Sequence, residues 1–504
     1  MIPLSLEDIA TLTGGTLDLV DDPSVEVTGS VEFDSRKLTP GGLFVALPGL
    51  RVDGHDFAAQ AIADGAVAAL AARPVDAPAI IAAPVEQPDS NAEAFDNDPT
   101  GATASVLAAM SALARHVATT LTARGMTIIG VTGSAGKTST KDMMASLFRA
   151  AGPTVAPPGS FNNEIGHPYT VLTCEEDTRY LVAELSARGV GHVAHLARIA
   201  PPRIGVVLNV GTAHLGEFGG REVIAQAKGE LVEALPSAAD GGVAVLNADD
   251  EYVAGMAGRT TAKVVLFSTA VDADTAAERG IDYFATELRT DEFARASFTL
   301  HTPAGVAPVT LKVAGEHQVA NALAAAAAAL EAGLPFDLVV KALGSHEASS
   351  AHRMDVQHRA DGVTVINDSY NANPDSMRAG LRALARMADA RGGAPTIAVL
   401  GQMGELGDAA TEEHQALAEE LAALGVRSLV AVGTGVHIGA LAARAAELGI
   451  ATVSADSADA AVNLVDNQLT AFLDHDAAHP PVVLVKASYA ESLWRVAQGL
   501  LATG

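Results

Sequence analysis

The sequence has a single cysteine, Cys174, so it can form no internal disulfide and gives no sign of an oxidising compartment. The N-terminal stretch, MIPLSLEDIATLTGG, lacks the basic start and apolar core of a signal peptide. The alanine-rich run from Asn321 to Leu330 is too short to cross a bilayer. We therefore expect a soluble cytoplasmic protein.

Positive charge is also scarce. Lys and Arg number 32 against 60 Asp and Glu, and the net charge of −28 argues against binding nucleic acid or anionic membranes through bulk electrostatics. The hydrophobic fraction of 49% is ample for buried cores, and 504 residues indicate about three domains.

A phosphate-binding pattern stands out in the stretch IIGVTGSAGKTSTK. The apolar run Met126–Val131 predicts a buried strand, Gly133 ends it, and a helix-forming segment follows Lys137. A strand, a tight glycine turn and a helix N-terminus present backbone N–H groups and the positive end of the helix dipole to an anion. Gly133 and Gly136 let the backbone approach phosphates, Lys137 can reach the outer ones, and the Thr138 hydroxyl can hold Mg²⁺.

This pattern is a variant of the general P-loop, because Val131 stands where the first glycine is expected. The alternative is an ordinary glycine turn between a strand and a helix. The order of strand, GKT and helix favours the phosphate site.

Residues 1 to about 80 predict a small mixed α/β unit, with a helix near Leu4–Gly14 and strands at Val25–Phe33 and Gly42–Leu47. The run Asp34-Ser35-Arg36 places an arginine fork beside a hydroxyl, which suits a phosphate or a uracil edge. A surface turn with a local ion pair explains it equally well. Residues 83–103 are acidic and rich in Pro, Asn and Asp, and predict a solvated loop or mobile linker.

From residue 126 to about 345, strands alternate with helices, which predicts a mostly parallel sheet covered by helices on both faces. Ligands in such sheets bind beyond the carboxyl ends of the strands. Polar residues follow these ends at Glu184, Asn209, His214 and Asp249-Asp250. An acidic residue closing a strand beside a P-loop commonly fixes Mg²⁺, although the aspartate pair could equally cap a helix.

Lys228 lies in the amphipathic segment REVIAQAKGELVEAL. From the residues alone, a single lysine on such a helix is expected on the solvated surface.

Residues from about 350 to 504 repeat the α/β alternation and predict a Rossmann-like domain, with strands at Val363–Asn367, Thr396–Leu400, Ser428–Val432 and Val482–Lys486. No G-x-G-x-x-G opens it, so dinucleotide binding is not supported. Two polar clusters, NDSYNANPDSM and LGQMGELG, follow its first two strands.

These segments together resemble the Mur ligase family, the ATP-dependent amide-forming enzymes of peptidoglycan precursor synthesis. The resemblance covers nearly the whole chain and runs through DSRKLTPGGLFVALPG, TGSAGKTSTK, FNNEIGHP, NVGTAHLGEFG, AKGE, LNADD, GEHQVANALAA, AHRMD, NDSYNANPDSM and LGQMGELG. It implies three domains, at residues 1–104, 105–347 and 348–504, with the UDP-precursor site in the first. Lys141, SYNANPDSM and LGQMGELG favour the branch whose substrates are UDP-N-acetylmuramoyl-tripeptide and D-alanyl-D-alanine.

The resemblance also implies roles for individual residues. The ATP phosphates would be bound by Gly133, Ser134, Ala135, Gly136, Lys137, Thr138 and Ser139, and the rest of the nucleotide by Asn321, Arg353 and Asp368. Two Mg²⁺ ions would be held by Thr138, Glu184, His214 and Lys228, the last as a carbamate. The catalytic set would be Lys137, Glu184, His214 and Lys228. The precursor and the incoming amine would contact Asp34, Ser35, Arg36, Asn162, Asn163, Asn371, Asn373 and Ser376.

The chain departs from the family at VKASY, where Tyr489 replaces an expected arginine. Three alternatives remain open: a sibling ligase, a folylpolyglutamate synthase-type ligase with another acceptor, and a nucleotide-binding sensor without catalysis. We expect a monomer.

Overall fold

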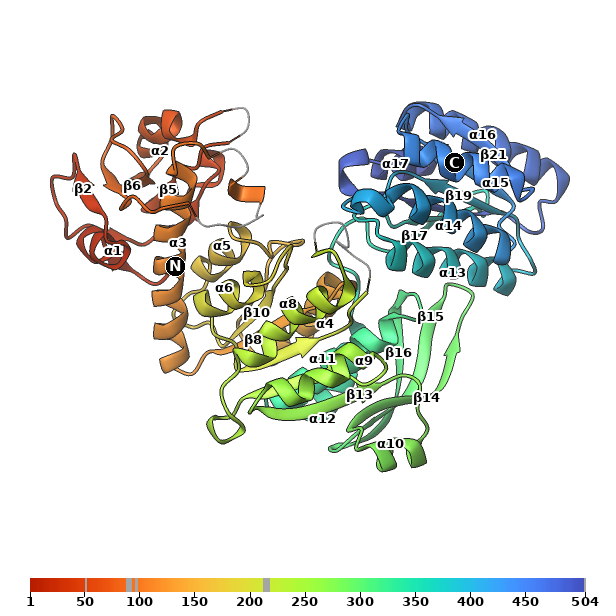
Figure 1. Cartoon of the computed structure of the whole chain (residues 1–504), viewed down its shortest axis with the longest axis horizontal. Helices are drawn as coiled ribbons and strands as arrows, with labels where there is room; N and C mark the ends of the chain where they lie inside the picture. The colour runs from red at the N-terminus through yellow and green to blue at the C-terminus, as the bar shows by residue number, and fades with distance from the viewer. Residues whose placement is uncertain (50–51, 88–92, 96–97, 212–217, 503–504) are drawn as a thin grey trace.

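The computed structural model describes residues 1–504 except 50–51, 88–92, 96–97, 212–217 and 503–504. In this part of the chain the strands form three large sheets, one in each of three lobes. Figure 1 shows the N-terminal lobe (red to orange) and the C-terminal lobe (blue) side by side above the central lobe (yellow to green). This arrangement matches the predicted α/β fold of three domains.

The N-terminal lobe holds a five-stranded sheet in the order β2-β7-β6-β5-β4 and a small antiparallel pair, β1-β3. The predicted strand over 25–33 is divided, because β3 pairs with β1 while β4 pairs with β5. The chain changes partner at Gly29, where a Cβ would collide with the backbone of Gly42 and Pro40. The elements are β1 (Leu4–Ser5), α1 (Leu6–Thr13), β2 (Thr16–Asp18), β3 (Glu26–Val27), β4 (Val31–Glu32), β5 (Gly42–Val45), α2 (Ala58–Ala63), β6 (Ala66–Ala71) and β7 (Ala79–Ile81).

Some of the described residues of segment 83–103 are buried, which corrects the prediction of a solvated loop. Phe95 and Asp98 are buried, and Asp98 accepts a hydrogen bond from Ala104 N at 2.8 Å at the start of α3 (Ala102–Ala123). A phenylalanine and a capping carboxylate give this polar segment two anchors on the helix that follows.

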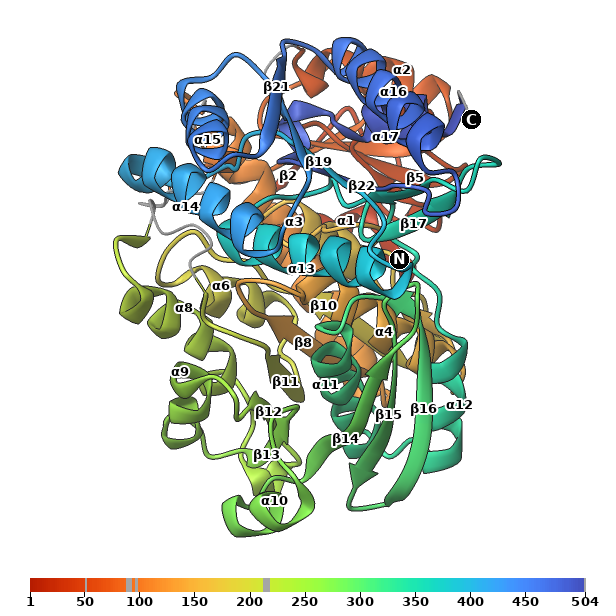
Figure 2. The ribbon, with the colours of Figure 1, turned by 90° about the vertical axis from the view of Figure 1, so that its right-hand side faces the viewer.

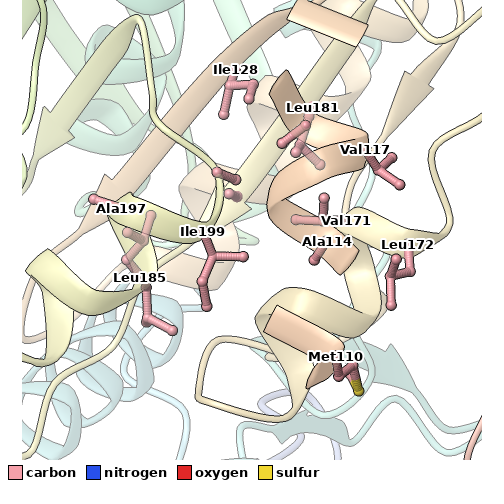
Figure 3. Close-up of a cluster of buried hydrophobic side chains, with 14 of the residues drawn as sticks. Met110, Ala114, Val117, Ile128, Val171, Leu172, Leu181, Leu185, Ala197 and Ile199 are labelled. Atoms are coloured by element: carbon pink, nitrogen blue, oxygen red, sulfur yellow. The ribbon is translucent and has the colours of Figure 1, made fainter. Parts of the chain in front are cut away.

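Helix α3 joins the N-terminal lobe to the central one. It packs against α1, α5 (Gly166–Leu172) and α6 (His192–Ile199). Figure 3 shows Met110, Ala114 and Val117 of α3 in one apolar cluster with side chains of α5, α6 and the central sheet. Among the described helices α3 alone has the length and apolar composition of a membrane span, and half of its most apolar window is buried in the fold. Its burial is that of a core helix.

The central lobe is built on a nine-stranded sheet in the order β16-β15-β14-β13-β12-β11-β8-β10-β9. Strands β8 to β14 run parallel to one another, as predicted. Strands β14, β15 and β16 form an antiparallel extension that was not predicted. The strands are β8 (Thr127–Thr132), β9 (Thr154–Val155), β10 (Tyr180–Glu184), β11 (Ile204–Val207), β12 (Val243–Asn247), β13 (Lys263–Ser268), β14 (Tyr283–Thr290), β15 (Arg295–Thr302) and β16 (Gly305–Ala314). The other helices are α4 (Lys137–Arg149), α8 (Arg221–Glu233), α9 (Glu251–Gly255), α10 (Ala273–Arg279), α11 (Gln318–Glu331) and α12 (Phe336–Ser345).

The C-terminal lobe has a six-stranded sheet in the order β17-β18-β22-β19-β20-β21, parallel except for the edge strand β17. Its strands are β17 (Asp355–His358), β18 (Thr364–Asn367), β19 (Thr396–Leu400), β20 (Ser428–Val432), β21 (Ala451–Ala455) and β22 (Val482–Lys486). Its helices are α13 (Pro374–Ala390), α14 (Ala410–Ala423), α15 (Val436–Glu447), α16 (Ala458–His475) and α17 (Trp494–Ala502). Figure 2 shows α13 on the side of this lobe that faces the central lobe.

Candidate active site

A cavity of about 610 Å³ lies between the central and C-terminal lobes. The central lobe contributes the loop after β8, the end of β10 and residues 160–164, and the C-terminal lobe contributes the loops after β18, β19 and β22. Strand β8 lies between β10 and β11, so the chain crosses over it from one side of the sheet to the other. Such a switch point at the carboxyl ends of parallel strands is where open α/β sheets bind ligands.

The predicted phosphate loop connects β8 directly to α4. Gly136 has φ +82°, and a Cβ there would come within 2.7 Å of Asn321 Oδ1. A Cβ on Gly133 would lie 2.9 Å from Leu208 Cβ, so both positions need glycine. No side chain caps α4, which leaves the N–H groups of its first turn and its dipole for an anion.

Two of the loop N–H groups do not face an anion, which corrects the sequence prediction. The carboxamide oxygen of Asn209 accepts hydrogen bonds from Ser134 N at 3.0 Å and Ala135 N at 2.9 Å, and Asn209 Nδ2 donates to Ala135 O at 3.1 Å. Asn209 follows β11 and therefore reaches the neighbouring loop. It acts as a brace for the loop, and the anion site consists of the start of α4.

Lys137 is the first residue of α4, and its Nζ donates to Gly133 O at 2.8 Å. Burial lowers the pKa of Lys137 below its ordinary value, while the Glu184 carboxylate acts in the opposite direction. A partly desolvated ammonium beside the loop can bind a phosphate strongly, because little water has to be displaced.

Glu184 ends β10 inside the cavity and is 1% exposed. Asn162 Nδ2 donates to Glu184 Oε1 at 2.7 Å, and Oε2 is buried without a hydrogen-bond partner. Thr138 lines the same cavity and is also buried. An unpartnered carboxylate oxygen beside a buried hydroxyl and a phosphate loop fits a hard cation such as Mg²⁺.

Lys228 is buried, at 2% exposure, and not solvated as the residue pattern alone predicts. Burial lowers its pKa well below the ordinary value, and the charge of Lys137 lowers it further. The neighbouring Glu230 of the same helix accepts from Gly191 N at 2.5 Å and Ala194 N at 2.9 Å, so α8 is held against the start of α6. A lowered pKa increases the fraction of the amine that is uncharged, and the uncharged amine is the form that reacts with CO₂.

His214 lies outside the described residues. In the described part of the chain no three His, Cys, Asp or Glu side chains gather into a metal-binding group. Any cation at Glu184 would therefore need oxygens from a nucleotide or a modified side chain in addition to the described protein ligands.

A second cavity of about 250 Å³ adjoins the phosphate loop and lies between α11 and α13. Its walls include Gly136, Phe267, Asn321 and Asp368. Asn321 Nδ2 donates to Gln318 Oε1 at 2.8 Å, which orients the carboxamide. A small, mostly apolar space at the end of a phosphate loop has the character of a site for a nucleotide base.

Asp368 lines both cavities and is held by Lys486, whose Nζ lies 2.5 Å from Asp368 Oδ2. Its other oxygen accepts from Met354 N at 3.1 Å. Arg353 lines the larger cavity with its guanidinium carbon 4.2 Å from the centre of the Tyr370 ring, and its Nε is buried without a hydrogen-bond partner.

The predicted substrate residues Asn162, Asn163, Asn371, Asn373 and Ser376 all line the larger cavity. Asn373 and Ser376 also form a capping box at the start of α13, so these two side chains have a structural task there. Asn163 accepts from Gly166 N at 2.9 Å. The structure thus brings the set together and shows that part of its hydrogen-bonding capacity is already used.

Asp34, Ser35 and Arg36 do not line this cavity. Arg36 Nε and Nη2 donate to the Asp34 carboxylate at 2.8 and 2.9 Å, and the arginine side chain is 86% exposed. The geometry is that of a surface turn with a local ion pair. Asp250 caps α9 through Tyr252 N and Val253 N, as the capping alternative anticipated.

Three contacts between lobes were missed in the sequence. Ser160 Oγ lies 2.5 Å from Tyr370 OH, Arg188 Nη2 lies 2.9 Å from Glu405 Oε1, and Arg386 pairs with Glu316. Glu405 has φ +62°, unusual for a glutamate, and Tyr489 lies with its ring centre 5.3 Å from that of Tyr370. Of these features, only Glu405 had a local sign in the sequence, because it lies between Gly404 and Gly407 in the run GELG.

Comparisons with known proteins cover the whole chain. Family models match for the Mur ligase family catalytic domain at residues 28–118, the Mur ligase middle domain at 131–329 and the Mur ligase glutamate ligase domain at 352–488. The chain is 51% identical to UDP-N-acetylmuramoyl-tripeptide--D-alanyl-D-alanine ligase of Mycobacterium tuberculosis, over 100% of this chain and 98% of the relative.

Two solved structures extend these matches. A MurF crystal structure from Acinetobacter baumannii superposes with a TM-score of 0.82 at 30% identity, covering 99% of each chain. MurF ligase from Thermotoga maritima in complex with ADP superposes with a TM-score of 0.72 at 25% identity, covering 94% of this chain and 98% of that one.

The three-lobed fold and the phosphate loop facing an interdomain cavity define an ATP-dependent ligase that forms amide bonds. More specifically, the chain belongs to the Mur ligase family.

Proposed function

We propose that this ligase joins D-alanyl-D-alanine to UDP-N-acetylmuramoyl-tripeptide in the cytoplasmic synthesis of peptidoglycan precursors. The support is the 51% identity over the full chain to relatives that carry this activity in their name. The structural observation that carries the proposal is the shared cavity, which holds Lys137, Thr138 and Glu184 beside loops of the C-terminal lobe.

The reaction has to make a carboxylate reactive, because oxide is a poor leaving group. The terminal carboxylate of the tripeptide attacks the γ-phosphorus of ATP, which forms an acyl phosphate and releases ADP. The amine of D-alanyl-D-alanine then attacks the acyl carbon, and the tetrahedral intermediate collapses to the amide and inorganic phosphate. The amine loses one proton in this step.

The protein mainly positions these anions and offsets their repulsion. At an effective dielectric of ~20 and a separation of ~4 Å, two like charges repel by about 4 kcal/mol. Lys137 and the dipole of α4 supply positive charge at the phosphates. Two Mg²⁺ ions, when bound, would neutralise further charge on the phosphates and the carboxylate.

The protein ligands proposed for these ions are Thr138, Glu184, His214 and a carbamate on Lys228. The unpartnered oxygen of Glu184 and the buried amine of Lys228, whose pKa burial lowers, support this assignment. Reaction of that amine with CO₂ would form an N–C bond and release one proton. The product, a carbamate, would be an anionic, carboxylate-like ligand.

For the nucleotide, we assign the phosphates to the start of α4, residues 136–139, and the base to the cavity at Asn321. Asp368 lines both this cavity and the larger one, and we assign it to the ribose. Arg353 lines the larger cavity, and we assign it to the nucleotide as well. The precursor peptide would enter along Asn162 and Asn163, and the dipeptide along Asn371, Asn373 and Ser376. The UDP end is assigned to residues 34–36 in the first domain, residues 1–104. The second domain, residues 105–347, would bind ATP, and the third, residues 348–504, would complete the site. We propose that the protein acts as a monomer.

The test is ADP release by the purified chain with MgATP, the tripeptide precursor and different amines. D-Alanyl-D-alanine should stimulate release, whereas diaminopimelate, lysine and glutamate should not. Stimulation by one of the other amines would identify a sibling activity, and binding of the precursor without any ADP would identify a sensor.

A further inference from the structure

Arg353 is flanked by two residues in the left-handed backbone region. His352 has φ +61° and Met354 has φ +48°, and neither is a glycine. A residue other than glycine is strained in this region and persists there only where its surroundings hold it. The two kinks together turn the Arg353 side chain toward the interdomain cavity.

The side chain of His352 is held on two sides. Asn367 Nδ2 donates to His352 Nδ1 at 2.9 Å, and Ser369 Oγ fixes the orientation of this carboxamide by donating to Asn367 Oδ1 at 2.6 Å. The imidazole also stacks on Trp494, with ring centres 5.7 Å apart and an interplanar angle of 16°. Asn367 is buried at 4% exposure, so this anchor is shielded from water.

The backbone of His352 is also bonded to a residue that contacts Arg353. Its carbonyl oxygen accepts from Tyr370 N at 3.1 Å, and the Tyr370 ring supports the Arg353 guanidinium. Met354 N donates to Asp368 Oδ1 at 3.1 Å, which ties the second kink to the same loop. A shift of His352 would therefore move both Arg353 and the ring beneath it.

We infer that His352 is a positioning residue for nucleotide binding: locked by Asn367 and Trp494, it holds the left-handed kink that places Arg353 over Tyr370. The inference rests on the proposed function only in assigning Arg353 to the nucleotide. It gives His352 a role through backbone conformation and predicts which side chains can replace it.

The replacements follow from the tolerance of the left-handed region. Asparagine adopts this conformation readily and retains a short hydrogen-bond acceptor, whereas a β-branched valine is strongly disfavoured there. His352→Asn should thus keep Arg353 in place, and His352→Val should release it. Asn367→Leu removes the anchoring donor at nearly constant volume and is a second, independent way to release it.

The measurement is the dissociation constant of MgADP by calorimetry on the full chain, with the melting temperature as a check on folding. We expect His352→Val and Asn367→Leu to weaken binding about tenfold and His352→Asn to stay within about threefold of the wild type. His479→Val, at an exposed position in the same lobe, is the matched control and should bind as the wild type does.

A double-mutant cycle separates positioning from a general loss of structure. Adding His352→Val to Arg353→Ala should weaken MgADP binding no further, because the group that His352 positions is already absent. Full additivity, wild-type affinity in His352→Val, wild-type affinity in Arg353→Ala, or an equal loss in His352→Asn and His352→Val would each overturn the inference. The MgADP titration contains no amine substrate, so its result does not depend on which amine the enzyme uses. An incorrect assignment of the amine would appear only in the turnover assay.

Discussion

Asn162 donates from Nδ2 to one carboxylate oxygen of Glu184 at 2.7 Å, and the other oxygen remains buried without a partner. A buried charge that is half satisfied is expensive to maintain. The carboxylate lies next to the phosphate loop, where a bound cation would satisfy its free oxygen. Nucleotide phosphates would complete the coordination of that cation.

Replacing Glu184 should separate catalysis from stability. Glu184→Gln keeps Oε1 for Asn162 but removes the charge, so we expect kcat to fall at least about 100-fold while the melting temperature stays equal or rises. Glu233→Gln is the matched control, because this glutamate is 48% exposed and pairs with Arg259 away from the cavity. Wild-type turnover by Glu184→Gln would remove Glu184 from the proposed cation site.

Lys228 should make stability depend on pH. Burial lowers its pKa below the ordinary 10.5, so between the two pKa values the unfolded chain binds a proton that the folded chain does not. Stability from this residue therefore rises as pH increases toward 10.5. In CO₂-depleted buffer, Lys228→Met should melt higher than the wild type at pH 7, by about 2–4 °C for each kcal/mol gained where the unfolding unit is one domain of about 150–250 residues. The difference should shrink by pH 10.

The same lysine should make activity depend on CO₂. Wild-type turnover should fall after CO₂ depletion and recover with bicarbonate, while Lys228→Met should stay at least about 100-fold less active in both conditions. Lys263→Met, at an exposed lysine paired with Glu331, should keep the wild-type response. A wild-type rate that ignores CO₂ would exclude the carbamate.

Asn209 should affect nucleotide binding without touching the nucleotide. Asn209→Ala frees two N–H groups of the phosphate loop, so we expect the KM for ATP to rise about tenfold with a smaller change in kcat. Asn463→Ala, on an exposed face of α16, is the control. An unchanged KM would mean that the loop keeps its conformation without this brace.

The lobes should move together on ligand binding. The contacts described above between these lobes, Ser160 with Tyr370, Arg188 with Glu405 and Arg386 with Glu316, are polar and partly exposed, so each holds the lobes weakly. Small-angle scattering should show a smaller radius of gyration with an ATP analogue, Mg²⁺ and precursor, through a hinge near residues 344–351. An unchanged scattering envelope would contradict this closure.

The sequence predicted the buried parallel strands well. The predicted bounds of β19, β20 and β22 agree with the structure, because strands covered on both faces are continuous apolar runs between polar breaks. The antiparallel extension β14–β16 was missed, since its strands alternate polar and apolar residues and have exposed faces. Helix α17 begins only at Trp494, because Ser492 interrupts the preceding segment with φ +54°.

At the site, the loop and Glu184 could be predicted because strand ends and glycine spacing are local signals. The burial of Lys228 could not, since its helix has polar and apolar residues like a surface helix and only the packing of α8 covers the amine. The brace by Asn209 depends on β11 lying next to β8, which is a property of sheet order. The capping box of Asn373 and Ser376, with Pro374 between them, was a local signal that could have been recognised.

The central claim is that the γ-phosphate of ATP is transferred to the peptide carboxylate before the amide forms. Precursor labelled with ¹⁸O in its terminal carboxylate tests it directly, by mass spectrometry of the phosphate released in the presence of D-alanyl-D-alanine. An acyl phosphate predicts that each phosphate carries one ¹⁸O from the carboxylate. Unlabelled phosphate released together with the amide product would contradict the account.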